Sequence, residues 1–494
     1  MKRMLPEEPA MRFALSFAKH LAVVAIVGWC FSFTAHLAAK EAAPSAVRAK
    51  NVIIMVADGA GFNTWRATSM YRGQLGNEIY DKPGWIQLAV TTYPLTTSTK
   101  PEGKEKQNEN LVYSPQKAWD PNKGYAWLKS SATDSAAAAT AMATGIKTYN
   151  NAINWDDRDR PLTGKTLPEI AHELGKSAGV VTSVQWSHAT PAGFGGAHNR
   201  ERDHYAEIAR EMLAAPYLQV IMGAGHPEYD NNGQRKSGEA TDKDCRYVGG
   251  LAEWQSLTAG RHPGGWTLIQ TKEQFEKLTQ GSTPAKVVGT AQVATTLQQA
   301  RGGLLGIVVR NEPFATPFND NVPTLATMAV GAINVLDNNP QGFYLMIEGG
   351  AVDWANHANQ LHRMIEEQSD FLAAVEAVVD WIEKNSSWDE TLLILTADHE
   401  CGLLWGPNSD KTPFDPVRDQ GPGKMPAARY NSTGHTNSLV PLYARGAGAD
   451  LFRKLIRGKD PRAAEAWGIS GEFVDNTDIF RVSRAVLTGQ NLAP

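Results

Sequence analysis

The sequence has little cysteine and no excess of one charge. Only three of its 494 residues are cysteine, and one of them, Cys30, lies near the N-terminus. The 48 basic and 52 acidic residues nearly balance, so no domain-wide positive field exists to attract nucleic acid or an anionic membrane. We therefore expect neither nucleic acid nor a membrane surface as a binding partner.

The apolar stretch near the N-terminus is also too short for a membrane span. Residues 21–35 form a run of roughly 15 apolar residues, whereas a transmembrane helix needs about 20. Basic residues precede this run and an alanine-rich segment follows it, which is typical of a secretory signal peptide. We predict that residues 1–39 form such a signal and that the protein is exported to the periplasm or beyond the cell. An uncleaved anchor is the alternative.

The remaining chain is long enough to bury a large core without disulfide bonds, since 42% of the residues are hydrophobic. Export leaves Cys245 and Cys401, and the sequence permits a disulfide between them without deciding whether it forms. No internal repeat is visible. We predict one domain over residues 48–490.

Short, nearly continuous apolar runs recur along this domain. Such runs are typical of strands covered on both faces. Helical patterns alternate with them, most clearly over residues 361–384. The pattern predicts an α/β fold with a large, mostly parallel central sheet covered by helices on both faces. The predicted strands are residues 51–58, 179–185, 218–225, 306–310, 342–350, 391–398 and 438–446.

Two segments depart from this pattern. Residues 229–265 are polar and glycine-rich, so we predict a solvated excursion from the sheet, with a structural cation site as the alternative. Residues 405–434 are dense in proline and glycine and separate two clusters of chemically active residues. A long loop in such a place is usually functional.

Three predicted strands end on an acidic residue: Asp58, Glu348 and Asp398. Ligands bind at the carboxyl ends of strands in parallel α/β sheets, so these acids are expected at one site. A lone acid at a strand end is usually a turn former or a helix cap. Several carboxylates gathered together instead require cations to neutralise them.

Histidines accompany these acids. Asp353 and His357 are four residues apart and therefore share one face of a helical turn. His399 directly follows Asp398, and His435 shortly precedes the last predicted strand. Carboxylate and imidazole ligands together suit zinc.

The segment ATDSAAAATAMATG, residues 132–145, contains seven alanines and predicts a helix over residues 136–144. Ser135 lies at the first turn, where unpaired N–H groups and the helix dipole favour negative charge. A serine there can simply cap the helix. A nearby cation can instead lower the pKa of the hydroxyl and make it a nucleophile without a histidine base.

Five motifs occur in the order in which the alkaline phosphatase family has them, and the sequence resembles that family over residues 51–446. The motifs are VADGAGF, TDSAAAATAMATG, EGGAVDWANH, TADH and GHT. The resemblance implies hydrolysis of small phosphate monoesters through a phosphoserine at Ser135. It also implies a homodimer.

The resemblance further implies two zinc ions and one magnesium ion, although the third site could take another divalent cation. The first zinc would be held by Asp353, His357 and His435. The second would be held by Asp58, Asp398, His399 and the Ser135 oxygen. The third cation would be held by Asp58, Glu348 and Thr190, with His188 binding it directly or through water.

The roles of three residues are affected by differences between this sequence and the family pattern. Arg200 resembles the arginine that clasps the phosphate, but the segment from His188 to Arg200 is one residue short, so Arg202 is the alternative. His188 stands where some members have aspartate and others have histidine. Trp354 follows Asp353 where some members have lysine or histidine, so we expect an indole rather than a cation beside the substrate.

Two other functions compete with this interpretation. One is a phosphodiesterase or sulfatase on a related metal-bearing fold, although no C/S-x-P-x-R pattern for formylglycine formation is present. The other is an exported protein that captures phosphate or zinc without chemistry. Such a protein would have no use for a serine at the start of a helix.

Overall fold

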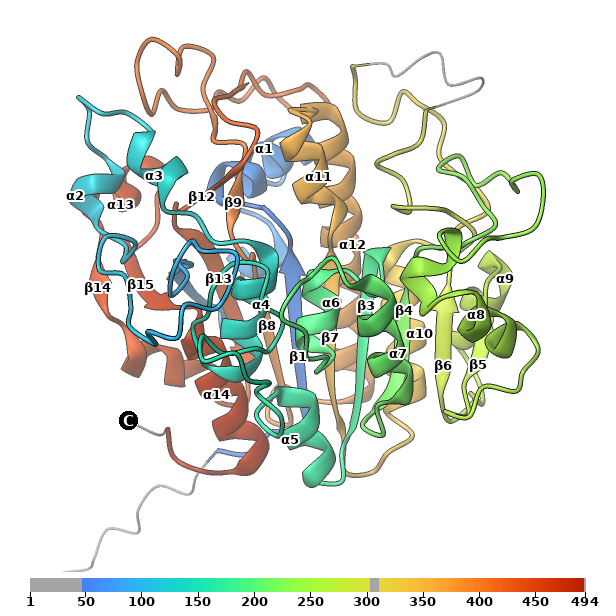
Figure 1. The fold of residues 1–494 in the computed structure, drawn as a ribbon. Helices are drawn as coiled ribbons and strands as arrows, with labels where there is room; N and C mark the ends of the chain where they lie inside the picture. The colour runs from blue at the N-terminus through green and yellow to red at the C-terminus, as the bar shows by residue number, and fades with distance from the viewer. Residues whose placement is uncertain (1–46, 303–310, 493–494) are drawn as a thin grey trace, which may run out of the picture. The chain divides into compact units, whose positions relative to one another are not determined.

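A large sheet organises the computed structural model, which describes residues 47–302 and 311–492 (Figure 1). Its strands are β1 (Asn51–Ala57), β2 (Ile86–Thr91), β3 (Ser177–Gln185), β4 (Leu218–Ala224), β5 (Thr267–Ile269), β6 (Val287–Thr290), β7 (Phe343–Gly349), β8 (Thr391–Thr396), β13 (Val440–Gly446), β14 (Gly458–Lys459) and β15 (Glu472–Asp475). Two small antiparallel ladders join β9 (Glu400–Cys401) to β12 (His435–Thr436) and β10 (Leu404–Trp405) to β11 (Arg429–Tyr430).

The sheet is mostly parallel, which confirms the predicted fold class. Its 11 strands follow the order β14-β15-β2-β13-β8-β1-β7-β3-β4-β6-β5. Every neighbouring pair from β8 to β5 is parallel, whereas β13 runs antiparallel to both β8 and β2. All seven residues of β1 are buried, as expected for a strand covered on both faces.

Helices cover both faces of the sheet (Figure 1). One face carries α4 (Ser135–Thr144), α5 (Leu167–Glu173), α6 (Ala189–Phe194), α7 (Tyr205–Ala214) and α14 (Thr477–Thr488). The other carries α1 (Phe62–Arg72), α10 (Leu325–Leu336) and α12 (Leu361–Asn385). The remaining helices are η1 (Ile79–Asp81), α2 (Pro115–Ala118), α3 (Ala126–Ser130), η2 (Asp244–Val248), α8 (Leu251–Thr258), α9 (Lys272–Leu278), α11 (Ala351–His357), η4 (Ala449–Leu455) and α13 (Pro461–Trp467).

The predicted helices and excursions were largely found. The helix predicted over residues 361–384 is α12, which continues to Asn385. The excursion at residues 229–265 is not a simple solvated loop, because it contains η2 and α8. The segment 405–434 holds β11 and is otherwise irregular or turn-rich. The predicted strand at residues 306–310 and the predicted signal at residues 1–39 lie outside the described residues.

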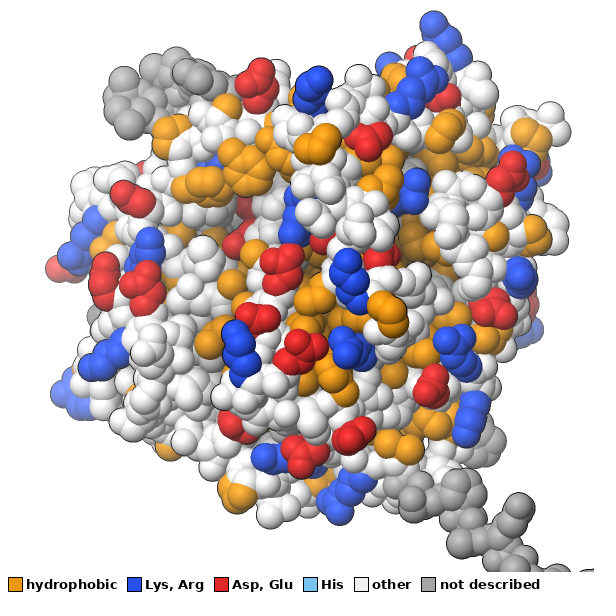
Figure 2. Space-filling model, turned by 180° about the vertical axis from the view of Figure 1, so that it is seen from behind, with side chains coloured by type: hydrophobic (Ala, Val, Ile, Leu, Met, Phe, Trp, Pro, Cys, Tyr) orange, Lys and Arg blue, Asp and Glu red, His pale blue; other side chains and the backbone are white. Residues whose placement is uncertain are grey.

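The described residues belong to one compact unit by their contacts. Within the described parts of that unit, no helix has both the length and the apolar character that crossing a bilayer requires. Acidic and basic side chains are interspersed over the face opposite to that of Figure 1, in keeping with the balanced composition (Figure 2). Cys245 and Cys401 are both buried and free, so they form no disulfide in this structure.

Candidate metal centre and active site

The three acid-terminated strands are neighbours at the middle of the sheet. β1 lies between β7 and β8, and Val56 of β1 is in register with Glu348 on one side and Thr396 on the other. Because the three strands are parallel, Asp58, Glu348 and Asp398 meet at the same edge. The register of the sheet therefore brings together acids that are up to 340 residues apart.

One group of ligand-type atoms consists of Asp58, Asp398 and His399, whose donor atoms lie within 4.8 Å of one another. Backbone N–H groups of Gly59 and His399 donate to Asp398 Oδ1 at 3.0 and 2.9 Å. Among the described residues, Asp398 Oδ2 and Asp58 Oδ1 are buried without a hydrogen-bond partner. His399 Nε2 lies 3.1 Å from Asp398 Oδ2 and 3.6 Å from Asp58 Oδ1. A cation between these three atoms would satisfy buried oxygens that are costly to leave without a hydrogen bond.

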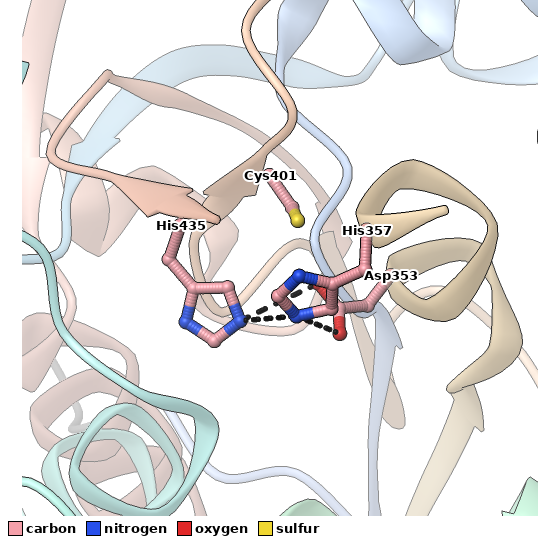
Figure 3. A group of neighbouring side chains, drawn as sticks. All are labelled: Asp353, His357, Cys401 and His435. Carbon is pink, nitrogen blue, oxygen red and sulfur yellow. Dashed lines mark hydrogen bonds and ion pairs between the residues drawn. The ribbon is translucent and has the colours of Figure 1, made fainter. Parts of the chain in front are cut away.

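A second group consists of Asp353, His357, His435 and Cys401, again within 4.8 Å (Figure 3). His357 Nε2 lies 3.1 Å from Asp353 Oδ2 and 3.0 Å from His435 Nε2. The Nδ1 atoms of both rings contact backbone carbonyls, of Thr433 at 2.6 Å and Thr133 at 3.0 Å. Each Nδ1–H therefore donates to a carbonyl, so in neutral rings the two Nε2 lone pairs face each other. A cation or a proton must lie between them.

The acid Glu348 lies beside these two groups. The Thr182 hydroxyl donates to Glu348 Oε2, whereas Oε1 is buried without a partner in the part of the chain that the structure describes. Thr190 Oγ1, on α6, is likewise buried and without a partner among the residues described. An unpaired carboxylate oxygen and an unpaired hydroxyl are ligands suited to magnesium.

Burial and mutual repulsion explain the pKa values of the acids. Burial raises the pKa of Asp398 to about 6 and that of Glu348 to about 7. The pKa of Asp58 is raised well above its usual value by burial, and next by the charges of Asp398 and Asp353. Glu348 is therefore partly protonated at neutral pH, and a bound cation would replace its proton and favour the ionised form of all three acids.

The pKa values of the histidines in the site are shifted in opposite directions. Burial lowers the pKa of His399 and of His435 to about 4, so both rings are neutral at pH 7 and can bind a metal. The hydrogen bond to Asp353 raises the pKa of His357 to about 9. A proton on His357 thus occupies the space between the ligand atoms in the metal-free protein.

Ser135 is the first residue of α4, as the alanine-rich segment predicts. The preceding Asp134 caps the helix by accepting a hydrogen bond from Ala137 N–H at 3.0 Å. Ser135 Oγ is buried and lies 3.2 Å from His399 Nε2. The hydroxyl therefore lies both at the positive end of the helix dipole and beside the Asp58 group.

The two candidate arginines lie in different surroundings. Arg202 Nη1 contacts Asp134 Oδ2 at 2.9 Å, and its side chain is only 16% exposed. The Arg200 side chain is 57% exposed, lies 3.4 Å from Asp159 and stacks over Trp155. The structure therefore places Arg202, the alternative, against the residue next to Ser135, and it places Arg200 on the surface.

His188 and Trp354 lie against each other, with ring centroids 5.7 Å apart. His188 Nδ1 is buried and has no partner among described atoms, and burial lowers the pKa of this ring to about 3. Neither residue belongs to the two groups of clustered ligand atoms. His188 is the N-cap residue of α6, the helix that carries Thr190.

Cys401 was not predicted as part of the site. From the sequence alone we interpret this residue only as a possible disulfide partner of Cys245. A signal was nevertheless present, because Cys401 follows His399 by two residues, and alternate residues of an extended segment point to the same side.

The sequence model of the alkaline phosphatase family matches residues 49–451. The chain belongs to the alkaline phosphatase family. It is 29% identical to alkaline phosphatase 4 of Bacillus subtilis (strain 168), over 83% of this chain and 87% of that protein. It is 26% identical to the alkaline phosphatase of Escherichia coli (strain K12), over 89% of this chain and 86% of that one. The chain is accordingly a phosphatase, which confirms the predicted enzyme class.

Solved structures agree with the fold. The cold-active alkaline phosphatase of a psychrophilic Shewanella species has a TM-score of 0.58 and 25% identity, covering 88% of this chain and 99% of that chain. The Thermus thermophilus alkaline phosphatase has a TM-score of 0.59 and 19% identity, and the match covers 91% of this chain and 93% of that chain. The large central sheet is thus a property shared with the family.

The raised pKa values predict how metal binding depends on pH. Zinc and magnesium added to the metal-free protein at pH 6 should release protons, because Glu348 and His357 are protonated there and ligands bind deprotonated. The release should decline between pH 6 and about 9, because Glu348 and then His357 lose their protons before the metal binds. Calorimetry in buffers with different ionisation enthalpies measures it, and a release that is constant from pH 6 to 9 contradicts the prediction.

The same groups affect the stability of the metal-free protein. Glu348 and His357 have a folded pKa above the unfolded one, so their contribution is complete below the unfolded value and is lost as pH rises through the folded value. His399 and His435 have the opposite shift, but both are neutral in the folded and the unfolded protein above about pH 7. The metal-free protein should therefore lose stability between about pH 7 and 9, and the metal-loaded protein should not.

Proposed function

We propose that the protein hydrolyses phosphate monoesters through a phosphoserine intermediate on Ser135. The observation that carries this proposal is the position of the Ser135 hydroxyl, 3.2 Å from His399 Nε2 at the N-terminus of α4. Two groups of metal-type ligands lie next to it. A protein that only captures phosphate would gain nothing from a buried hydroxyl in that place.

The unpaired atoms of the site fit the expected ions. Asp353, His357 and His435 would hold one zinc ion, and Asp58, Asp398, His399 and the Ser135 oxygen would hold a second. Asp58, Glu348 and Thr190 would hold magnesium or another divalent cation, with His188 acting directly or through water. When bound, these ions supply the positive charge that lowers the pKa of the serine hydroxyl and offsets the charge of the phosphoryl group.

Ser135 acts as the nucleophile. Its hydroxyl loses its proton to solvent, and the oxygen attacks phosphorus as the bond to the substrate alcohol oxygen breaks. That oxygen takes a proton from water and leaves as the alcohol, and a phosphoserine remains. Water then attacks phosphorus, and the bond to Ser135 Oγ breaks to release inorganic phosphate. The N–H groups of the first turn of α4 favour negative charge on the serine oxygen before attack and after release.

We assign the clasping of the phosphoryl group to Arg202 rather than to Arg200. Asp134 contacts Nη1 of Arg202 and thereby fixes the guanidinium beside Ser135. A guanidinium offers a planar fork of donors that matches two phosphoryl oxygens. Trp354, which contacts His188, would lie beside the substrate.

The proposal also includes export to the periplasm or beyond the cell and a homodimer. Both are implied by the resemblance to the family.

The substrate class is tested with three aryl esters. We expect an aryl phosphate to be hydrolysed at least roughly tenfold faster than a bis-aryl phosphate, because a diester has one charge fewer for Arg202 to contact. An aryl sulfate should be slower still. Release of the aryl alcohol at alkaline pH, followed by absorbance, measures all three. A faster reaction with the diester or the sulfate would replace this function by that of a phosphodiesterase or a sulfatase.

The nucleophile is tested with Ser135→Ala. Turnover should fall at least about a thousandfold, because no other group in the site replaces the serine oxygen. No phosphoenzyme should form when the protein is quenched in acid after reaction with labelled substrate. The matched control is Ser130→Ala, which removes an exposed hydroxyl that donates to the Trp127 carbonyl. Equal phosphoenzyme in both variants would rule Ser135 out.

The two arginines form a matched pair of variants. Arg202→Ala should raise the KM for an aryl phosphate and the inhibition constant of inorganic phosphate roughly 10- to 100-fold, because a hydrogen bond to a charged group contributes about 1.5–3 kcal/mol. Arg200→Ala removes the same side chain from the surface and should change neither constant appreciably. Steady-state kinetics with phosphate as inhibitor measures both, and the reverse pattern would return the role to Arg200.

A further inference from the structure

Cys401 is a chemically unused member of the group shown in Figure 3. Its Sγ lies within 4.8 Å of the ligand atoms of Asp353, His357 and His435. The figure shows the thiol pointing toward His357 and Asp353 rather than away from them. The side chain is fully buried, so solvent does not compete for the sulfur.

The backbone explains why the sulfur lies there. Cys401 of β9 is directly opposite His435 of β12 in an antiparallel pair, and residues in such a pair point to the same face. Cys401 N–H also donates to the Gly59 carbonyl at 3.0 Å, and Gly402 N–H donates to the Gly434 carbonyl at 3.1 Å. The position of the thiol is therefore set by the same ladder that positions His435.

We propose that Cys401 supplies a fourth protein ligand, a thiolate sulfur, to the metal held by Asp353, His357 and His435. The inference rests on the proposed function, because that function requires an ion at this group. Sulfur, imidazole nitrogen and carboxylate oxygen are all ligands that zinc takes in proteins, so the donor set of this group would suit that ion. The thiol proton passes to solvent when the sulfur binds the ion.

A sulfur ligand changes what the site can bind and do. Thiolate is a soft donor and favours zinc and other thiophilic ions over magnesium, so Cys401 would make this site selective. The alternative role of the thiol is that of a hydrogen-bond donor to Asp353, and Cys401→Ser preserves a donor while removing the sulfur.

X-ray absorption at the zinc edge tests the inference on the zinc-loaded protein. The wild type should show a sulfur shell at about 2.3 Å besides the nitrogen and oxygen shell at about 2.0–2.2 Å. Cys401→Ser should lose the sulfur shell and keep the other. Cys245→Ser is the matched control, because Cys245 is the other buried free cysteine and lies in η2, outside the group. That control should keep both shells.

Zinc affinity gives a second readout. Cys401→Ser should bind zinc at least roughly 10- to 100-fold more weakly than the wild type. Loss of a residue that only hydrogen-bonds to a metal ligand costs that much, and loss of a direct ligand should cost no less. If Cys401→Ser does not fold, the X-ray absorption spectra of the wild type and of Cys401→Thr test whether the sulfur binds zinc.

Each outcome separates this inference from the proposed function. Zinc bound to the wild type without a sulfur shell overturns the role of Cys401 and leaves the phosphatase site intact. A sulfur shell that persists in Cys401→Ser or disappears in Cys245→Ser also overturns it. A wild-type protein that takes up no zinc overturns the two-zinc proposal and the role of Cys401 together.

Discussion

Repulsion among buried acids is the constraint on which this site depends. Asp58, Asp398 and Glu348 lie at one edge of the sheet and are each shielded from water, so burial and their mutual charges raise their pKa values. A fold gains nothing from such an arrangement unless cations occupy it. The central strands are therefore arranged for binding ions, and the stability of the fold is coupled to that binding.

The sheet and the segments outside it position different side chains of the site. Adjacent parallel strands set the positions of the acids, whereas α11 and the short β9–β12 ladder bring the histidines to the same place. The carbonyls of Thr133 and Thr433 orient the two imidazoles. Thr133 also precedes the cap of α4, so a single turn of chain connects the orientation of His435 with the position of Ser135.

Much of this arrangement could be predicted from the sequence, because strong local patterns carry it. The all-apolar run of β1 and the alanine-rich α4 are local signals, and the acids follow their strands directly. The choice between Arg200 and Arg202 was not predictable, because spacing across a shortened loop does not show which side chain turns inward. Cys401 was missed because its alternation with His399 extends over only three residues, which is too short to distinguish a strand from a turn. The helices of residues 229–265 were missed because their apolar positions, such as Trp254 and Leu257, are sparse.

The wholly buried helix α4 has a consequence for how this protein can change. All ten of its residues are buried, and it lies so close to α6 that a Cβ added at Gly193 would come within 2.8 Å of Ala139. Neither helix has a long side chain at this contact that could move aside, so the serine can shift only if two packed helices shift with it. The packing of α4 against α6 therefore holds Ser135 in a fixed place and leaves little room for change in this part of the protein.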